Sequence, residues 1–129
     1  MTGYLLDTNV ALLALASADA IPAATRRRIE ARPRVMSVIS YWEVLLKSMK
    51  GKLDVGDPRH WWREALERLA ATPLPLRPEH VSAIHELPGI HQDPFDRALI
   101  AQAQTETLVL VTTDVAIVKY AVESLRVVV

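Results

Sequence analysis

The segment YLLDTNVALLALA (Tyr4–Ala16) joins three apolar residues, one acid and a long apolar stretch. Three apolar residues bounded by polar ones are typical of a short buried strand, so we expect a strand over Tyr4–Leu6 and a helix over Asn9–Ala16. A strand that runs directly into a helix is the repeating unit of α/β domains with a parallel sheet. The segment therefore predicts a chain built from strand–helix units.

The same alternation continues to the end of the chain. We expect further strands over Val35–Val38, Leu74–Leu76, Leu108–Val111 and Val127–Val129. We expect further helices over Ala23–Ala31, Tyr41–Lys50, Asp57–Leu69, a short stretch from Pro78, Asp93–Gln104 and Val115–Ala121. The predicted fold class is α/β, with a central, mostly parallel five-stranded sheet flanked by helices, in a single domain that spans residues 1–129.

The composition excludes several classes of protein. Half of the 129 residues are hydrophobic, which is too many for a disordered chain. Because the chain has no cysteine, it can form no disulfide, thiolate metal site or cysteine nucleophile. Any metal must therefore be held by oxygen or imidazole ligands.

The charges balance, with fifteen basic and fifteen acidic side chains. This balance excludes a protein that holds nucleic acid by bulk positive charge. No lysine or arginine precedes Arg26, so the apolar stretch Val10–Ala18 lacks the basic flank of a secretory signal, and no stretch approaches the roughly 20 apolar residues of a membrane span. We expect a cytoplasmic protein with no membrane contact.

Acidic residues recur where the predicted strands end and helices begin. Asp7 follows the first strand, Glu43 is expected in the first turn of the helix after the second, Asp93 and Asp96 open the helix at Pro94, and Asp114 follows the fourth strand. Ligands of open α/β sheets bind beyond the carboxyl ends of the strands. The sequence therefore predicts a pocket lined by several carboxylates.

The acids also have structural interpretations: helix capping for most of them, and stabilisation of the helix dipole for Asp96. Ser40–Glu43 has the pattern of a capping box, Asp93 precedes a proline as an N-cap does, and Asp114 is placed to cap the last helix. Asp7 has a weaker structural explanation, because Thr8 or Asn9 can cap the following helix equally well.

Clustered carboxylates favour a divalent cation. Two unit charges about 4 Å apart repel by about 4 kcal/mol at an effective dielectric constant near 20, so the cluster requires a proton or a cation. We expect at least one raised carboxyl pKa in the metal-free protein. Mg²⁺, or Mn²⁺ in its place, prefers such oxygen ligands and can activate a water molecule against a phosphodiester. Phosphodiester hydrolysis is thus the predicted chemistry.

The sequence contains four ordered motifs: YLLDTN at Tyr4–Asn9, SVISYWE at Ser37–Glu43, HQDPFDR at His91–Arg97 continuing into LIAQA, and LVTTD at Leu110–Asp114. Together they resemble the motifs of PIN-domain proteins of the VapC toxin type. The intervals of 36, 53 and 18 residues between Asp7, Glu43, Asp96 and Asp114 make the likeness specific, and it covers nearly the whole chain.

The resemblance implies a Mg²⁺-dependent endoribonuclease, the toxin of a VapBC-type toxin–antitoxin pair. It implies an RNA substrate, a cognate antitoxin protein as partner and a homodimer. The implied catalytic and metal-binding residues are Asp7, Glu43, Asp96 and Asp114, with Asp93, Thr112, Asn9 and Arg97 as additional candidates. Thr113 stands where relatives commonly carry arginine, which leaves substrate contacts near Asp114 open.

Several other residues have two interpretations. The basic cluster Arg26, Arg27, Arg28, Arg32 and Arg34 could contact RNA or an antitoxin, or form a solvated helix face. Arg97 could contact RNA or simply pair with Asp93 one turn away. Trp42, Trp61 and Trp62 could stack on bases, although core packing is more usual. For His91, nearest the predicted site, we expect a loop role.

Rival classes fit the sequence less well. A haloacid-dehalogenase-like phosphatase needs a second acid at the position of Asn9, and a receiver domain needs acids before Asp7 and a lysine near Thr112. Two alternatives stay open: an acid-lined metal-binding module without catalysis, and a PIN nuclease of RNA processing that has no antitoxin.

Overall fold

A computed structural model describes residues 2–89, 93–120 and 122–128. The predicted loop residue His91 lies outside the described residues, as do the ends of the last predicted helix and strand at Ala121 and Val129. Within the described ranges, no helix has the length and apolar character needed to cross a membrane.

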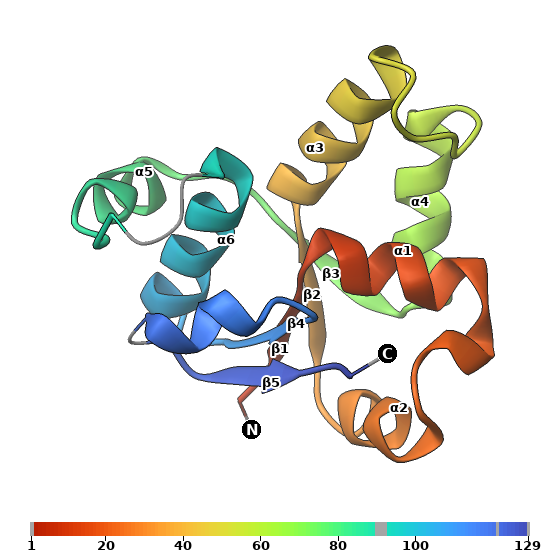
Figure 1. Cartoon of the computed structure of the whole chain (residues 1–129), viewed down its shortest axis with the longest axis horizontal. Helices are drawn as coiled ribbons and strands as arrows, with labels where there is room; N and C mark the ends of the chain where they lie inside the picture. Colours follow the sequence, from red (N-terminus) through yellow and green to blue (C-terminus); the bar gives the residue numbers. More distant parts are fainter. Residues whose placement is uncertain (1, 90–92, 121, 129) are drawn as a thin grey trace.

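Five parallel strands form one sheet in the order β3-β2-β1-β4-β5. Their bounds are β1 Tyr4–Leu6, β2 Arg34–Ser37, β3 Ala71–Leu74, β4 Val109–Thr112 and β5 Ser124–Arg126. The predicted α/β fold with a five-stranded sheet is confirmed, and the sheet is parallel throughout. The fully buried strand β1 lies in the middle of the sheet, paired with β2 and β4 (Figure 1).

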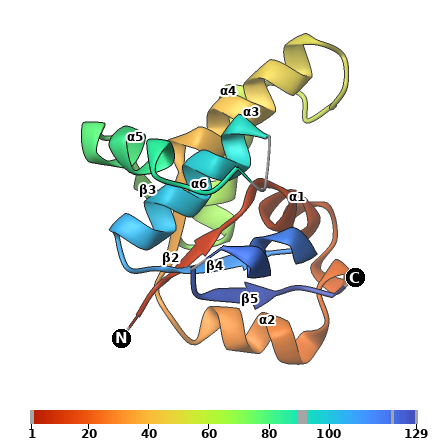
Figure 2. The same cartoon turned by 60° about the vertical axis from the view of Figure 1, so that its left-hand side comes forward.

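Helices cover both faces of the sheet, as Figures 1 and 2 show. The α-helices are α1 Thr8–Ala16, α2 Ala23–Glu30, α3 Val38–Met49, α4 Pro58–Arg68, α5 Pro78–His85 and α6 Pro94–Thr105, and the 3₁₀ helices are η1 Ala18–Ala20 and η2 Val115–Lys119. The strand alternation divides the core in two. Tyr4 and Leu6 pack with side chains of α1, α2 and α4, whereas Leu5 packs with those of α6.

Several predicted elements differ from those in the structure. Strand β3 lies three residues before the predicted Leu74–Leu76 and includes Pro73, which an edge strand tolerates because its N–H can face away from the ladder. Strand β5 precedes the predicted Val127–Val129, since Leu125 pairs with Val111. The last predicted helix is a short 3₁₀ helix, η2.

A buried polar network ties the start of α3 to α6. Ser37 is the N-cap of α3, and its hydroxyl accepts a hydrogen bond from the Ile39 N–H (3.0 Å) while donating to Gln102 Oε1. The Gln102 amide in turn donates to the Pro75 carbonyl (3.2 Å). Ser37 and Gln102 are both fully buried, so this bridge replaces water for two polar groups inside the core.

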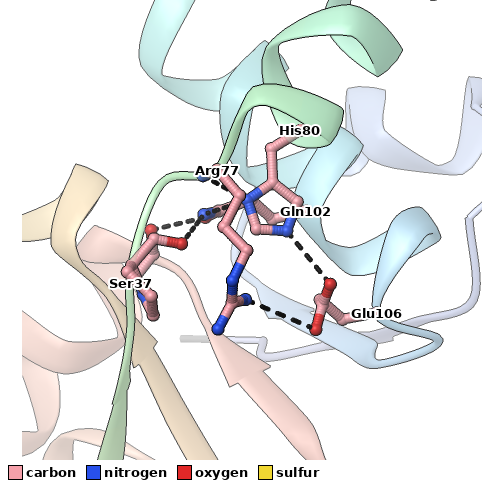
Figure 3. A network of polar contacts seen from close by, with 6 residues as sticks. Ser37, Arg77, His80, Gln102 and Glu106 are labelled. Carbon is pink, nitrogen blue, oxygen red and sulfur yellow. Dashed lines mark hydrogen bonds and ion pairs between the residues drawn. The ribbon is translucent and has the colours of Figure 1, made fainter.

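His80 extends the network to α5 (Figure 3). Its Nδ1 accepts from the Arg77 backbone N–H (3.0 Å) and from the Gln102 amide (3.3 Å). Because Nδ1 is an acceptor, Nε2 carries the proton and donates to Glu106 Oε2 at 3.1 Å. The network thus fixes α5, α6 and the start of α3 relative to one another.

The substitution Gln102→Ala tests this network. It removes a fully buried amide and leaves the Ser37 hydroxyl and the Pro75 carbonyl without their partner. We expect a loss of about 2–4 kcal/mol in the free energy of unfolding, measured by urea denaturation. Gln104→Ala, at a partly buried position of the same helix, is the control and should cost less than about 1 kcal/mol. Equal effects of the two substitutions would contradict a role for the network.

Candidate active site

Asp7 lies at the carboxyl end of the central strand. It is the N-cap of α1, and its Oδ1 accepts a hydrogen bond from the Val10 N–H at 2.8 Å. The expectation that Thr8 or Asn9 could take the capping role is therefore wrong. Thr8 instead donates its hydroxyl hydrogen bond to Ser40 on α3 (2.9 Å), and Asn9 is exposed in the first turn. Asp7 is only 8% exposed.

Thr112 connects Asp7 to Asp114. The Thr112 hydroxyl accepts the Asp114 N–H (3.0 Å) and hydrogen-bonds to the Asp7 carboxylate. Asp114 is partly buried, and its side chain caps η2 by accepting from the Ala116 N–H at 2.8 Å. The ends of β1 and β4 therefore bring these three predicted residues into one hydrogen-bonded group.

Glu43 lies in the second turn of α3, not the first. The helix begins three residues before the predicted start because Ser37 caps it, so the capping-box interpretation of Ser40–Glu43 is wrong. Glu43 is 5% exposed, and its Oε2 accepts from Lys47 Nζ at 2.7 Å. Its Oε1 is a buried side-chain polar atom without a hydrogen-bond partner among the described residues. The ion pair with Lys47 therefore satisfies one of the two buried Glu43 oxygens and leaves the other without a structural explanation.

Asp93 and Asp96 open α6. Asp93 caps the helix, accepting from the N–H groups of Phe95 (2.8 Å) and Asp96 (3.3 Å), with Pro94 at the first helical position. The capping interpretation of Asp93 is confirmed. Asp96 lies in the first turn and is partly buried.

Lys47 is the residue that the sequence analysis missed. Besides its ion pair with Glu43, its ammonium interacts electrostatically with Asp93 and Asp96. The ion pair joins residues four apart on a helix, a spacing that could have indicated it. One ammonium group thus links α3 to the acidic start of α6.

The electrostatics agree with the predicted raised pKa, with a different main cause. Burial is the largest influence on the pKa of Asp7 and raises it. Hydrogen bonds from Thr112, Val10 and Thr113 lower this pKa. Repulsion from Glu43 raises it and is the smallest of these influences. The hydrogen bond to Glu43 raises the pKa of Lys47. Desolvation of Asp7 therefore matters more than repulsion between carboxylates.

Most of the acidic side chains interact electrostatically, directly or through Lys47, but those that the structure describes do not surround a common point. Within the described ranges, no three Asp, Glu or His side chains lie close enough together to hold one metal ion. The donor set nevertheless fits a hard divalent cation, because burial disfavours the charged form of Asp7 and Glu43 has a buried oxygen without a hydrogen-bond partner among the described residues. A cation between these carboxylates would remove both costs.

The predicted basic residues have largely structural partners. The Arg34 guanidinium donates to the carbonyls of Leu69, Ile29, Glu30 and Arg32, and Arg32 lies over the Tyr4 ring. Arg26 lies 3.9 Å from Asp19, while Arg27 and Arg28 are exposed on α2. Arg97 donates to the carbonyls of Pro88, Ile84 and Leu87, so it braces the chain after α5.

The three tryptophans differ in environment. Trp61 is buried in the core, and the ring of Trp62 stacks on Tyr41 at 5.1 Å. Trp42 is 51% exposed and meets Phe95 edge to face at 5.3 Å. Since Trp42 precedes Glu43 and Phe95 precedes Asp96, this aromatic pair borders the acidic group.

A model of the PIN domain family matches residues 4–123. The chain belongs to the PIN domain family. PIN domains are nucleases that generally use divalent metals, and all four predicted acids lie within the matched range. A search of curated proteins gives no significant sequence match.

Solved structures share the fold at low sequence identity. VapBC2 from Rickettsia felis, bound to a promoter DNA fragment, has a TM-score of 0.74 and 16% identity, covering 95% of this chain and 97% of that one. DNA-bound VapBC from Salmonella typhimurium has a TM-score of 0.70 and 16% identity, with 98% of both chains covered. FitAcB from Neisseria gonorrhoeae has a TM-score of 0.66 and 22% identity, covering 95% and 96%. At these identities the likeness establishes the fold.

The buried Asp7 predicts a pH dependence of stability. Since its folded pKa is raised above the ordinary value of 3.8, the folded protein binds the proton more tightly than the unfolded chain. This contribution to stability is complete below pH 3.8 and is lost as the pH rises through the folded pKa.

Asp7→Asn keeps a capping oxygen and removes the charge. The quantity to compare is the free energy of unfolding of wild type minus that of Asp7→Asn in metal-free buffer. We expect this difference to fall as the pH rises from 3.8 through the raised pKa of Asp7, and to stay constant above that pKa. Urea unfolding of both proteins across this range measures the difference. A difference that rises with pH would show that the pKa of Asp7 is lowered.

Proposed function

We propose that the protein is a Mg²⁺-dependent endoribonuclease and the toxin of a VapBC-type pair. The observation that carries this proposal is the buried Oε1 of Glu43, which has no hydrogen-bond partner in the part of the chain that the structure describes and interacts electrostatically with the buried Asp7 at the edge where the parallel strands end. In this proposal Asp7, Glu43, Asp96 and Asp114 hold the ion, and Mn²⁺ can replace Mg²⁺. Asp93, Asn9, Thr112 and Arg97 support the site from its margins.

When bound, the ion supplies an activated water and offsets negative charge on the phosphodiester. The chain's residues prepare this chemistry by orienting oxygen atoms. The Val10 N–H and the Thr112 hydroxyl hold the Asp7 carboxylate, and the Asp93 cap fixes the first turn of α6, which carries Asp96. Preoriented ligands lose little entropy on binding, which strengthens the site.

RNA cleavage with Mg²⁺ tests the proposal. We expect wild type to cut a mixed RNA panel and Asp7→Asn and Asp96→Asn each to lose roughly 100-fold or more of the cleavage rate, because each removes a charged ligand. Asp54→Asn, in the exposed loop between α3 and α4, is the control and should keep full activity.

The outcomes separate the alternatives. Metal binding by wild type, measured by calorimetry, without cleavage of any RNA would contradict the nuclease proposal and favour a metal-binding module. Cleavage by a protein whose gene has no antitoxin-like neighbour would favour a PIN nuclease of RNA processing. Unchanged metal affinity in Asp96→Asn would contradict the placement of the site.

We propose further that one cytoplasmic PIN domain spans residues 1–129 and assembles as a homodimer that binds an antitoxin protein. The VapBC complexes with the same fold support an antitoxin. A dimer is supported by exposed apolar side chains on α3: Val38, Trp42 and Met49 are 36%, 51% and 75% exposed.

Met49→Glu tests the homodimer. Met49 is the most exposed of these side chains and is the last residue of α3. We expect wild type to elute as a dimer in size-exclusion chromatography with light scattering. Met49→Glu should raise the dimer dissociation constant at least about tenfold, because it would bury a charge at the interface. Lys50→Glu, exposed at the end of the same helix, is the matched control. A monomeric wild type would contradict the dimer proposal.

A further inference from the structure

The Oε2 atom of Glu43 accepts a hydrogen bond from the side chain of Lys47. Lys47 Nζ lies 2.7 Å from Glu43 Oε2, and the two side chains are 43% and 6% exposed. The carboxylate is therefore fixed inside the protein, whereas the ammonium reaches it from a stem that is still in contact with solvent. Of the two partners, only Lys47 is free to leave without exposing the core.

The same ammonium faces more than one carboxylate. Its electrostatic partners are Glu43 on α3 and Asp93 and Asp96 at the start of α6. These acids come from the two elements that border the candidate active site, and Glu43 also acts on Asp7. The Lys47 ammonium thus interacts with the same carboxylates, Glu43 and Asp96, that would bind a divalent ion.

A divalent ion and an ammonium cannot share Glu43 without repulsion. In the metal-free protein, loss of Lys47 would be unfavourable. Glu43 would then be a buried carboxylate whose two oxygens both lack a hydrogen-bond partner among the described residues. The two cations therefore satisfy the same carboxylate in two different states of the protein.

We propose that Lys47 is the counter-cation of the metal-free site and competes with the divalent ion for Glu43. Metal binding displaces the ammonium towards solvent, so Lys47 stabilises the metal-free fold and weakens metal affinity. This inference rests on the proposed metal-dependent function, and it assigns to Lys47 a positioning role that acts through Glu43.

Lys47→Met tests the inference, because it keeps a stem of similar length and removes the charge. In EDTA we expect a lower Tm than wild type, since Glu43 loses its partner. In calorimetric titration with Mn²⁺ we expect a dissociation constant about three- to tenfold lower than that of wild type, because the competing charge is gone. Lys50→Met, exposed at the C-cap of α3, is the control and should change neither quantity.

A second variant separates the ion pair from general effects of the substitution. In EDTA, Lys47→Met should lower Tm much less in a Glu43→Gln background than in wild type, because the pair is already broken. Equal decreases in both backgrounds would overturn the inference.

The metal titration distinguishes two failures. If wild type binds Mn²⁺ and Lys47→Met binds it equally or more weakly, Lys47 does not compete and only this inference fails. If wild type binds no Mn²⁺ at millimolar concentration, the proposed function fails and the inference fails with it.

Discussion

The burial of β1 between two parallel neighbours is the constraint on which the rest of the structure depends. Because β2 and β4 run in the same direction as β1, their carboxyl ends emerge at one edge of the sheet. Asp7 leaves the central strand at this edge, and Thr112 ends β4 beside it. The carboxylate is thereby kept at 8% exposure, which raises its pKa and favours a bound cation or proton.

Helix capping and the candidate metal chemistry use the same carboxylates. Asp7, Asp93 and Asp114 each accept a backbone N–H at the start of a helix, so the backbone orients these side chains before any ligand arrives. Glu43 differs, since it caps nothing and depends on Lys47. The buried network of Ser37, Gln102 and His80 holds α3 against α6 and so sets the spacing between Glu43 and the acids of α6.

Local sequence patterns were sufficient for the central strand, the Asp93 cap and the parallel α/β fold, because apolar runs and capping residues act over a few positions. The start of α3 was predicted wrongly, since Ser37 and Ser40 are both capable caps and the buried bond of Ser37 to Gln102 decides between them. That bond joins residues 65 positions apart. Strand β3 was misplaced for a similar reason, because pairing with β2 overrides the poor strand propensity of Pro73. Lys47 was missed because its partners on α6 become neighbours only in the fold.

The most direct test of the central claim is a crystal structure of the protein soaked in Mn²⁺, with the ion located by its anomalous scattering. We expect one strong anomalous peak at the carboxyl edge of the sheet, within bonding distance of carboxylate oxygens of Asp7 and Asp96, with the Lys47 ammonium withdrawn from Glu43. A peak elsewhere on the surface, or none at a saturating concentration of Mn²⁺, would contradict the claim that these carboxylates form a divalent metal site.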